Sequence, residues 1–157
     1  MIFQFSLGID LGTSNSAIAV ADFKTGHASI VEITQILGPN QIGEMPTLAS
    51  ALYIPNPQEF SADAVNVPWP SDPGIIGHFA REHGTLVPDR LVTSAKSWLS
   101  NPHVDPRQPV LPWASAIDEK LSPFECSRRY LAHLKAGFST PSPRKAAIGT
   151  FQKDKSS

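Results

Sequence analysis

The sequence predicts a mixed α/β fold, in which an amino-terminal β-meander is followed by short strands and helices. Two patterns carry this prediction. Apolar and polar residues alternate through the first third of the chain, as in half-buried strands. The stretch from Ser122 to Phe138 opens with a helix-start signal and continues with an apolar stripe. The chain is 157 residues long, enough for one domain, and most of its 15 prolines lie between Pro39 and Pro123, which predicts a loop-rich middle.

We expect three strands in the amino-terminal third. The first is marked by apolar residues at every second position: Phe3, Phe5, Leu7 and Ile9. "AIAVADF" (17–23) and "ASIVEI" (28–33) follow as the second and third strands. The residues at 24–27 supply the hairpin turn between them, with Gly26 free to adopt a positive φ.

The middle of the chain is expected to contain short elements separated by loops. Residues 35–44 read as a loop, 47–54 as a strand between two prolines, and 56–73 as a proline-rich surface loop. "GIIGHFAREHG" (74–84) predicts a short strand and then a helical turn or two from His78.

Two helices are predicted after residue 84. "PDRLVTSAKSWLS" (88–100) has Asp89 as a possible N-cap and places Lys96 at the margin of an apolar face. That face consists of Leu91, Val92, Ala95, Trp98 and Leu99. After a second proline-rich loop, Ser122 and Glu125 form a capping box around Pro123. The buried stripe of this second helix is expected at Tyr130, Leu131, Leu134 and Phe138.

Composition limits the classes of partner. The 13 basic and 14 acidic residues nearly cancel, so no nucleic-acid or anionic-membrane partner is expected. The single cysteine, Cys126, excludes an internal disulfide and suits a reducing compartment. The chain has no secretory-type leader and no apolar stretch near the ~20 residues of a membrane span. We therefore expect a soluble, cytoplasmic protein.

The joint between the first two strands, "IDLGTSNS" (9–16), carries more polar groups than a turn requires. The groups that could face a phosphate are Gly12, Thr13, Ser14 and Asn15. A glycine allows close approach to the backbone, successive N–H groups bind anions, and the side chains add hydroxyl and amide donors. Asp10 could hold Mg²⁺ through water. On these residues alone an ordinary polar hairpin is an equally good interpretation.

"GIDLGTSNSAIAV" (8–20) resembles the first phosphate-binding segment of the actin-like ATPase superfamily, above all that of DnaK-type seventy-kilodalton heat-shock chaperones. Four later stretches resemble that family in the same order: "EMPTLASALYI", "GIIGHFAREHG", "LVTSAKSWLS" and "LSPFECSRRYLAHLK". The stretch "LVTSAKSWLS" places the family's catalytic lysine at Lys96, which would otherwise be interpreted as a solvated lysine at the edge of a helix. The proline-rich loops at 55–73 and 101–113 depart from the family and indicate a divergent branch.

The resemblance implies a partial actin-like (ribonuclease-H-like) ATPase lobe over residues 1–138. It further implies binding of ATP or ADP with Mg²⁺, catalytic roles for Lys96 and Asp10, and a stress-response setting. In a full-length parent the partners would be unfolded polypeptides and co-chaperones. The family's second phosphate loop, second acid, adenosine pocket and peptide-binding domain have no counterpart here, so we expect a truncated or frame-shifted product or a fragment, with residues 139–157 as a disordered tail. Nucleotide binding should then be weak and hydrolysis near background.

Two alternatives stay open. One is a fragment of a sugar-kinase-like phosphotransferase, although the basic residue that usually follows the hydroxyl pair in those enzymes is absent from 15–18. The other is a non-catalytic interaction module that retains part of the fold and binds protein.

Overall fold

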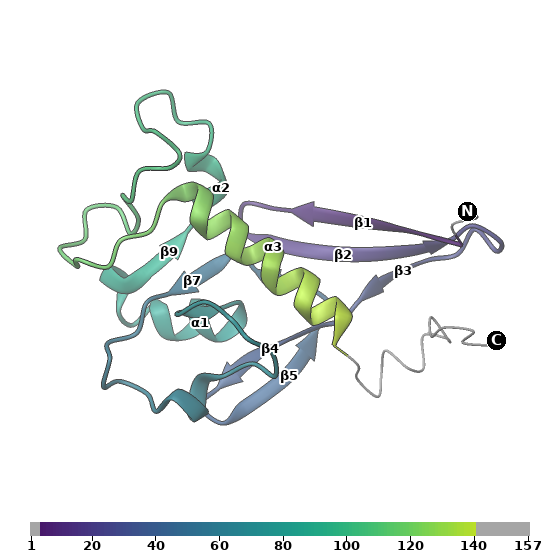
Figure 1. Ribbon diagram of the computed structural model, residues 1–157, viewed down its shortest axis with the longest axis horizontal. Coiled ribbons are helices and arrows are strands. Elements are labelled where there is room, and N and C mark those ends of the chain that lie inside the picture. Colours follow the sequence, from purple (N-terminus) through teal and green to yellow (C-terminus); the bar gives the residue numbers. More distant parts are fainter. Residues whose placement is uncertain (1–3, 141–157) are drawn as a thin grey trace.

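The computed structural model describes residues 4–140 of the chain. Within this range, nine strands form three antiparallel sheets, and three α-helices and two short 3₁₀ helices lie between them. The fold is therefore mixed α/β, as the sequence predicts. The amino-terminal strands form a long ribbon that extends away from the remaining elements, and the last helix crosses the molecule between the two parts (Figure 1).

The predicted β-meander is confirmed. It consists of β1 (Phe5–Leu11), β2 (Asn15–Asp22) and β3 (Ala28–Val31), each antiparallel to the next. Gly26 has a φ of 68° in the second turn, as its position predicts. The short strand β6 (Leu48–Ala49) pairs with the beginning of β2 and completes a four-stranded sheet.

The expected loop at 35–44 is wrong. This segment belongs to the hairpin of β4 (Ile33–Gly38) and β5 (Gln41–Met45). Pro39 and Asn40 form the tight turn between the two strands, in which Asn40 adopts a φ of 58°. The polar residue Gln35 is fully buried in β4, where its side chain finds partners in other segments instead of water.

The strand expected at 47–54 is divided in two at Ser50. After β6, the chain continues as β7 (Ala51–Tyr53), which lies between β8 (Ile75–Ile76) and β9 (Leu91–Thr93) in a three-stranded sheet. The helix α1 (His78–Gly84) follows β8 directly, as predicted.

The expected helix at 88–100 is mostly wrong. Pro88–Arg90 is a 3₁₀ turn, so Asp89 does not cap a helix, and β9 occupies the next three positions. Only α2 (Ala95–Trp98) is helical. The physical reason is tertiary pairing, because all three residues of β9 pair with β7 and Val92 is buried, and this outweighs the helical spacing of the apolar side chains.

The final helix is confirmed as α3 (Pro123–Ser139), with Ser122 Oγ accepting a 3.0 Å hydrogen bond from the Glu125 N–H. The predicted stripe is only half right. Its buried members are Tyr130 and Leu134. Leu131 and Phe138 are exposed, because they lie at the edge of the buried face.

Ser139 belongs to α3, so the predicted tail begins too early. The rest of that prediction, residues 141–157, lies outside the described residues. Among residues 4–140, no helix combines the length and the apolar character needed to cross a membrane.

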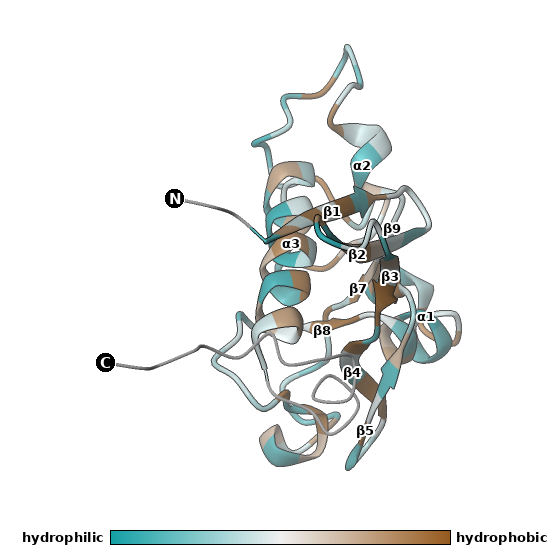
Figure 2. Cartoon of the chain, turned by 90° about the vertical axis from the view of Figure 1, so that its right-hand side faces the viewer, coloured by the Kyte–Doolittle hydropathy of each residue, from teal (hydrophilic) through white to brown (hydrophobic). Residues whose placement is uncertain are grey.

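Two clusters of buried side chains in the interior include residues of α3. One cluster of buried side chains contains Ile18, Val20, Val31, Ile33, Leu48 and Leu134. A second contains Leu52, Val92, Ala95, Leu111, Cys126 and Tyr130. Figure 2 shows the hydrophobic strands β7 and β8 lying between α3 and α1. Cys126 is a packed core residue, and burial raises the pKa of its thiol to about 12.

Candidate functional site

The hairpin that joins β1 to β2 is tight, and its geometry requires a glycine. A Cβ on Gly12 would lie 2.0 Å from the carbonyl oxygen of Asn15, closer than any real side chain approaches. Thr13 and Ser14, at the tip, are exposed, as is Asn15. The turn therefore presents polar groups to solvent on a backbone that no other residue at position 12 could adopt without distortion.

Ser50 holds the hairpin against the rest of the molecule. Its N–H donates to the carbonyl of Ser14 at 2.9 Å, and its hydroxyl donates to the carbonyl of Gly12 at 2.8 Å. Because that hydroxyl has one hydrogen, its 2.9 Å contact with the Ser16 hydroxyl is one in which Ser16 donates. Three hydrogen bonds at the break between β6 and β7 thus fix the orientation of the turn.

Arg81, from α1, contacts the same hairpin. Its guanidinium donates to the carbonyl of Ser14 and, at 2.9 Å, to the side-chain oxygen of Asn15. The Asn15 amide nitrogen is then the group left to donate to a ligand. Sequence reasoning missed Arg81, because a contact across 66 positions of the sequence has no local signal.

Asp10 lies near the end of β1, opposite Ala17 in the register, and is exposed. It is on the face of the sheet opposite to that of Ile18, which α3 covers. Among the described residues, no group of three or more His, Cys, Asp or Glu side chains could hold a metal ion. A single exposed carboxylate suits the water-mediated Mg²⁺ contact that the sequence predicts better than a cage of protein ligands.

Lys96 lies on α2, the turn beside this hairpin, and is exposed. Its neighbour Ala95 is buried in the cluster against which Leu11 packs, so the end of β1 and α2 share one core (Figure 1). Ser94, immediately before α2, adopts a left-handed conformation with a φ of 54°. Such a conformation is uncommon for serine and is often associated with functional sites. Within the range 4–140, no hydrogen bond or ion pair joins Lys96 to the hairpin.

The structure thus brings the hairpin residues together with Ser50 and Arg81 and places the turn of Lys96 next to them. The carboxylate of Asp10 and the Lys96 ammonium both remain exposed. Backbone donors, hydroxyls and two cationic side chains in one neighbourhood can stabilise a phosphate group.

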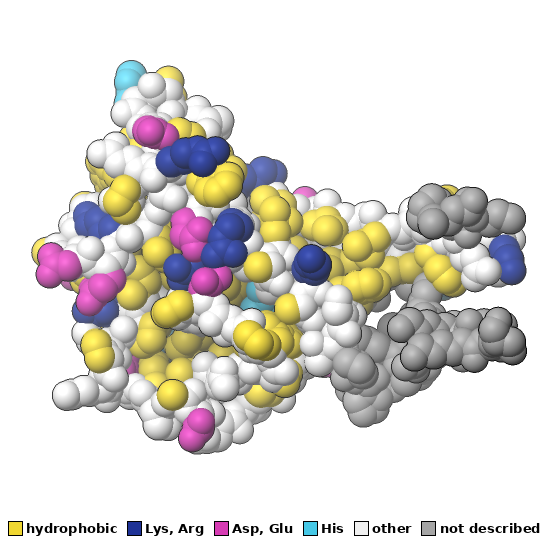
Figure 3. Space-filling view, viewed as in Figure 1, with side chains coloured by type: hydrophobic (Ala, Val, Ile, Leu, Met, Phe, Trp, Pro, Cys, Tyr) yellow, Lys and Arg dark blue, Asp and Glu magenta, His cyan; other side chains and the backbone are white. Residues whose placement is uncertain are grey.

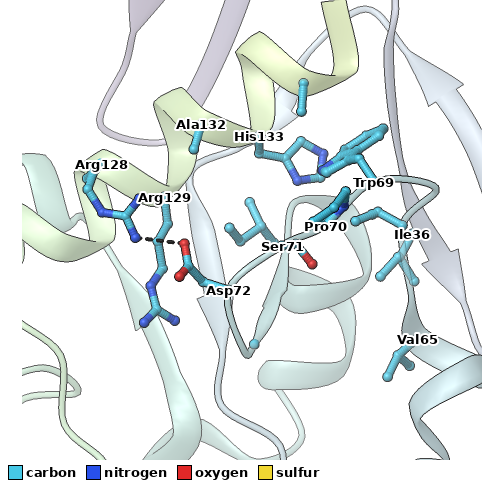
Figure 4. A pocket seen from close by; sticks show the side chains of 14 residues that line it. Ile36, Val65, Trp69, Pro70, Ser71, Asp72, Arg128, Arg129, Ala132 and His133 are labelled. Carbon is cyan, nitrogen blue, oxygen red and sulfur yellow. Dashed lines mark hydrogen bonds and ion pairs between the residues drawn. The ribbon is translucent and has the colours of Figure 1, made fainter. Parts of the chain in front are cut away.

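A cavity of about 410 Å³ lies elsewhere, between the loop at 65–76 and α3 (Figure 4). Arg128 and Arg129 line it, and the side chain of Arg129 is only 13% exposed. Arg128 binds Asp72 and Glu125 at 2.7 Å, and Arg129 binds Glu125 at 2.8 Å. The charges at this wall are therefore compensated within the protein.

The opposite side of the cavity is aromatic. His133 contacts the carbonyl of Thr34 at 2.9 Å through Nε2, and the ring of Trp69 meets the imidazole edge-on. Burial lowers the pKa of His133, so the ring is neutral and Nε2–H is the donor. Since none of the hairpin residues lines the cavity, the two features are separate.

Comparison with known proteins adds no relative to this description: no protein-family model, no curated protein and no solved structure matches the chain.

Proposed function

We propose that this chain is part of an actin-like ATPase lobe from a divergent relative of DnaK-type chaperones, and that the hairpin of residues 10–15 binds the phosphates of ATP or ADP with Mg²⁺. The observation that carries the proposal is the fixed hairpin, in which Gly12 permits the tight turn and Arg81 adds a cation. A turn held in place before its ligand arrives loses little entropy on binding.

Each group has a defined role in this proposal. The hydroxyls of Thr13 and Ser14 and the amide nitrogen of Asn15 donate to phosphate oxygens. Asp10 holds Mg²⁺ through water. The ammonium of Lys96 lies at the outer phosphate, where a positive charge stabilises the charge that develops during phosphoryl transfer.

The proposal includes weak binding and hydrolysis near background. Phosphoryl transfer depends on donors that surround the phosphate, and this hairpin supplies contacts from one side. A cytoplasmic setting, and unfolded polypeptides and co-chaperones as partners of a longer parent, belong to the same proposal and rest on the resemblance of the sequence.

Isothermal titration with Mg-ATP and Mg-ADP tests the proposal. We expect binding by the wild-type chain, and Asp10→Asn and Lys96→Ala should each weaken the binding of Mg-ATP by about tenfold, or 1.4 kcal/mol. Lys135→Ala is the matched control, because Lys135 is also an exposed helical lysine but lies on α3. Its affinity should equal that of the wild type.

Two results would contradict the proposal. The absence of any binding heat at millimolar nucleotide would remove the phosphate site. An ATP turnover comparable to that of a complete chaperone ATPase domain would contradict the one-sided site.

The non-catalytic interaction module remains the second candidate, because one observation favours it. The outer strand of the amino-terminal sheet is apolar and exposed, with Leu7 and Ile9 each 48% accessible.

A further inference from the structure

The outer edge of β1 has no neighbouring strand among residues 4–140, since β1 pairs only with β2. The N–H of Phe23 donates to the carbonyl of Gln4 at 3.0 Å, which sets the alternation of the antiparallel ladder. Residues 4, 6, 8 and 10 therefore direct their backbone groups toward β2. The backbone groups of Leu7 and Ile9 point outward, toward the open edge.

The side chains of Leu7 and Ile9 lie on the apolar face of the sheet. Leu7 and Ile9 stand opposite Val20 and Ile18, so they lie on the face of the sheet that α3 covers. Yet α3 does not reach them, and each is about half exposed. Leu7 and Ile9 therefore combine outward-facing backbone groups with uncovered apolar side chains.

The neighbouring side of α3 is apolar and exposed as well. Leu131 and Phe138 are 39% and 38% exposed, and they stand three residues before and four residues after Leu134, which packs against the sheet. Residues at these spacings are neighbours on a helix surface. Figure 3 shows the hydrophobic surface continuing from α3 toward the outermost strand. We call these four residues, Leu7, Ile9, Leu131 and Phe138, the edge patch.

Strand β1 lacks the sequence features that prevent an exposed strand edge from pairing with another strand. Its sequence, FSLGIDL, contains neither lysine nor proline, and Asp10 is its one charged residue. Long apolar edges without such protection pair with other strands. We therefore expect the open edge of β1 to pair with another strand.

We propose that this partner is β1 of a second copy of the chain, paired antiparallel across a two-fold axis at Gly8. In this register Leu7 stands opposite Ile9 of the second copy, so the outward-facing backbone groups of one chain meet those of the other. Asp10 stands opposite Ser6 of the second copy, and no like charges meet. The sequence of the strand is therefore complementary to itself, as a two-fold contact requires.

The same two-fold arrangement also brings the α3 residues of the edge patch close to the contact. A two-fold axis perpendicular to the sheet places both α3 helices on the same face, where Leu131 and Phe138 of each copy flank the joined strands. The contact closes after two copies, because it uses the outer edge of β1 in both. It does not depend on nucleotide, so it forms in the absence of Mg-ATP.

Sedimentation velocity over a range of micromolar concentrations tests the proposal. The wild-type chain should sediment with twice its mass of 17.0 kDa. The double variant L7K/I9K should be monomeric, since lysines then face each other at both paired positions. The double variant L7K/I9E should remain dimeric, because each lysine then faces a glutamate of the second copy.

Ile30→Lys is the matched control. Ile30 is 53% exposed in β3 and stands opposite Ala19, on the other face of the sheet from the edge patch. This variant should remain dimeric. The proposal is overturned by a monomeric wild-type chain, by open-ended assemblies, by a dimeric L7K/I9K, or by an L7K/I9E that dissociates like L7K/I9K.

Hydrogen exchange of the wild-type chain gives an independent test in case the lysine variants do not fold. The amides of Leu7 and Ile9 should become protected as concentration rises, while the N–H of Gly8, which faces β2, should be protected at every concentration. Exchange at Leu7 and Ile9 that stays fast at all concentrations overturns the proposal.

Discussion

The hairpin at the end of β1 and the outer edge of β1 differ in how they are held. At the hairpin, three hydrogen bonds that involve Ser50, together with the guanidinium of Arg81, fix the backbone, and the exposed groups are polar. Along the outer edge, Leu7 and Ile9 expose apolar side chains and direct their backbone groups away from β2. The hairpin is the surface proposed to bind phosphate, and the edge is the surface proposed to bind a strand. One strand carries two surfaces that differ in chemistry and in rigidity.

Of the changes that test this comparison, Gly12→Ala should have the largest effect on stability. The new methyl group would lie 2.0 Å from the carbonyl oxygen of Asn15, so the turn must open and lose its bonds to Ser50. We expect a loss of about 3 kcal/mol or more in the free energy of unfolding, measured by urea denaturation.

Gly8→Ala is the control for this change, because its Cβ would meet only the carbonyl oxygen of Ala19, at 3.9 Å. It should change the free energy of unfolding by less than about 1 kcal/mol. Equal effects of the two substitutions would show that the hairpin is not constrained as described.

Ser50→Ala should have an intermediate effect. Ser50 is buried, and removal of its hydroxyl leaves the carbonyl of Gly12 and the hydroxyl of Ser16 without their partner. The expected destabilisation is about 2 kcal/mol by urea denaturation. Ser97→Ala, at an exposed position on α2, should stay within about 0.5 kcal/mol of the wild type. A neutral Ser50→Ala would mean that the hairpin keeps its place without the side chain.

Acid should have the smallest effect and should act on α3, away from both surfaces of β1. Hydrogen bonds from Arg128, followed by those from Arg129, lower the pKa of Glu125 to about 2, although burial opposes them. The ordinary value is 4.5, so the unfolded chain binds the proton more readily. The stabilisation is therefore complete above pH 4.5 and is lost as the pH falls toward 2.

We expect this loss to be about 1 kcal/mol, because the ion pairs are partly exposed and screened by solvent. Urea unfolding of the wild type and of Glu125→Gln at pH 7 and pH 3 measures it. The variant should be less stable at pH 7 and should lose less stability than the wild type between the two values. Parallel losses in both proteins would assign the acid sensitivity to other groups.

The elements that the sequence predicts well are those with local signals. The meander has alternating residues and a glycine turn, and α3 has a capping box that the Ser122–Glu125 hydrogen bond confirms. The strand β9 was missed because its pairing with β7 is tertiary, and the β4–β5 hairpin because its turn residues suggested a longer loop.

The candidate site divides in the same way. Gly12 is apparent from the sequence, and its tight turn gives a physical reason for that residue. The clamp by Ser50 and Arg81 could not be anticipated, since it depends on how β6, β7 and α1 come to lie around the hairpin. The function assigned to the hairpin remains a prediction that nucleotide titration decides.

The buried side chain of Gln35 has a consequence for how the molecule opens. Its amide donates to the carbonyl of Thr47 at 3.0 Å, and its oxygen accepts from the N–H of His78 at 2.8 Å. One residue of β4 thus bridges the segment that leads into β6 and the first turn of α1, the helix that carries Arg81. Local unfolding of the β4–β5 hairpin would break both hydrogen bonds, so its opening is coupled to the loosening of α1 and of the segment before β6.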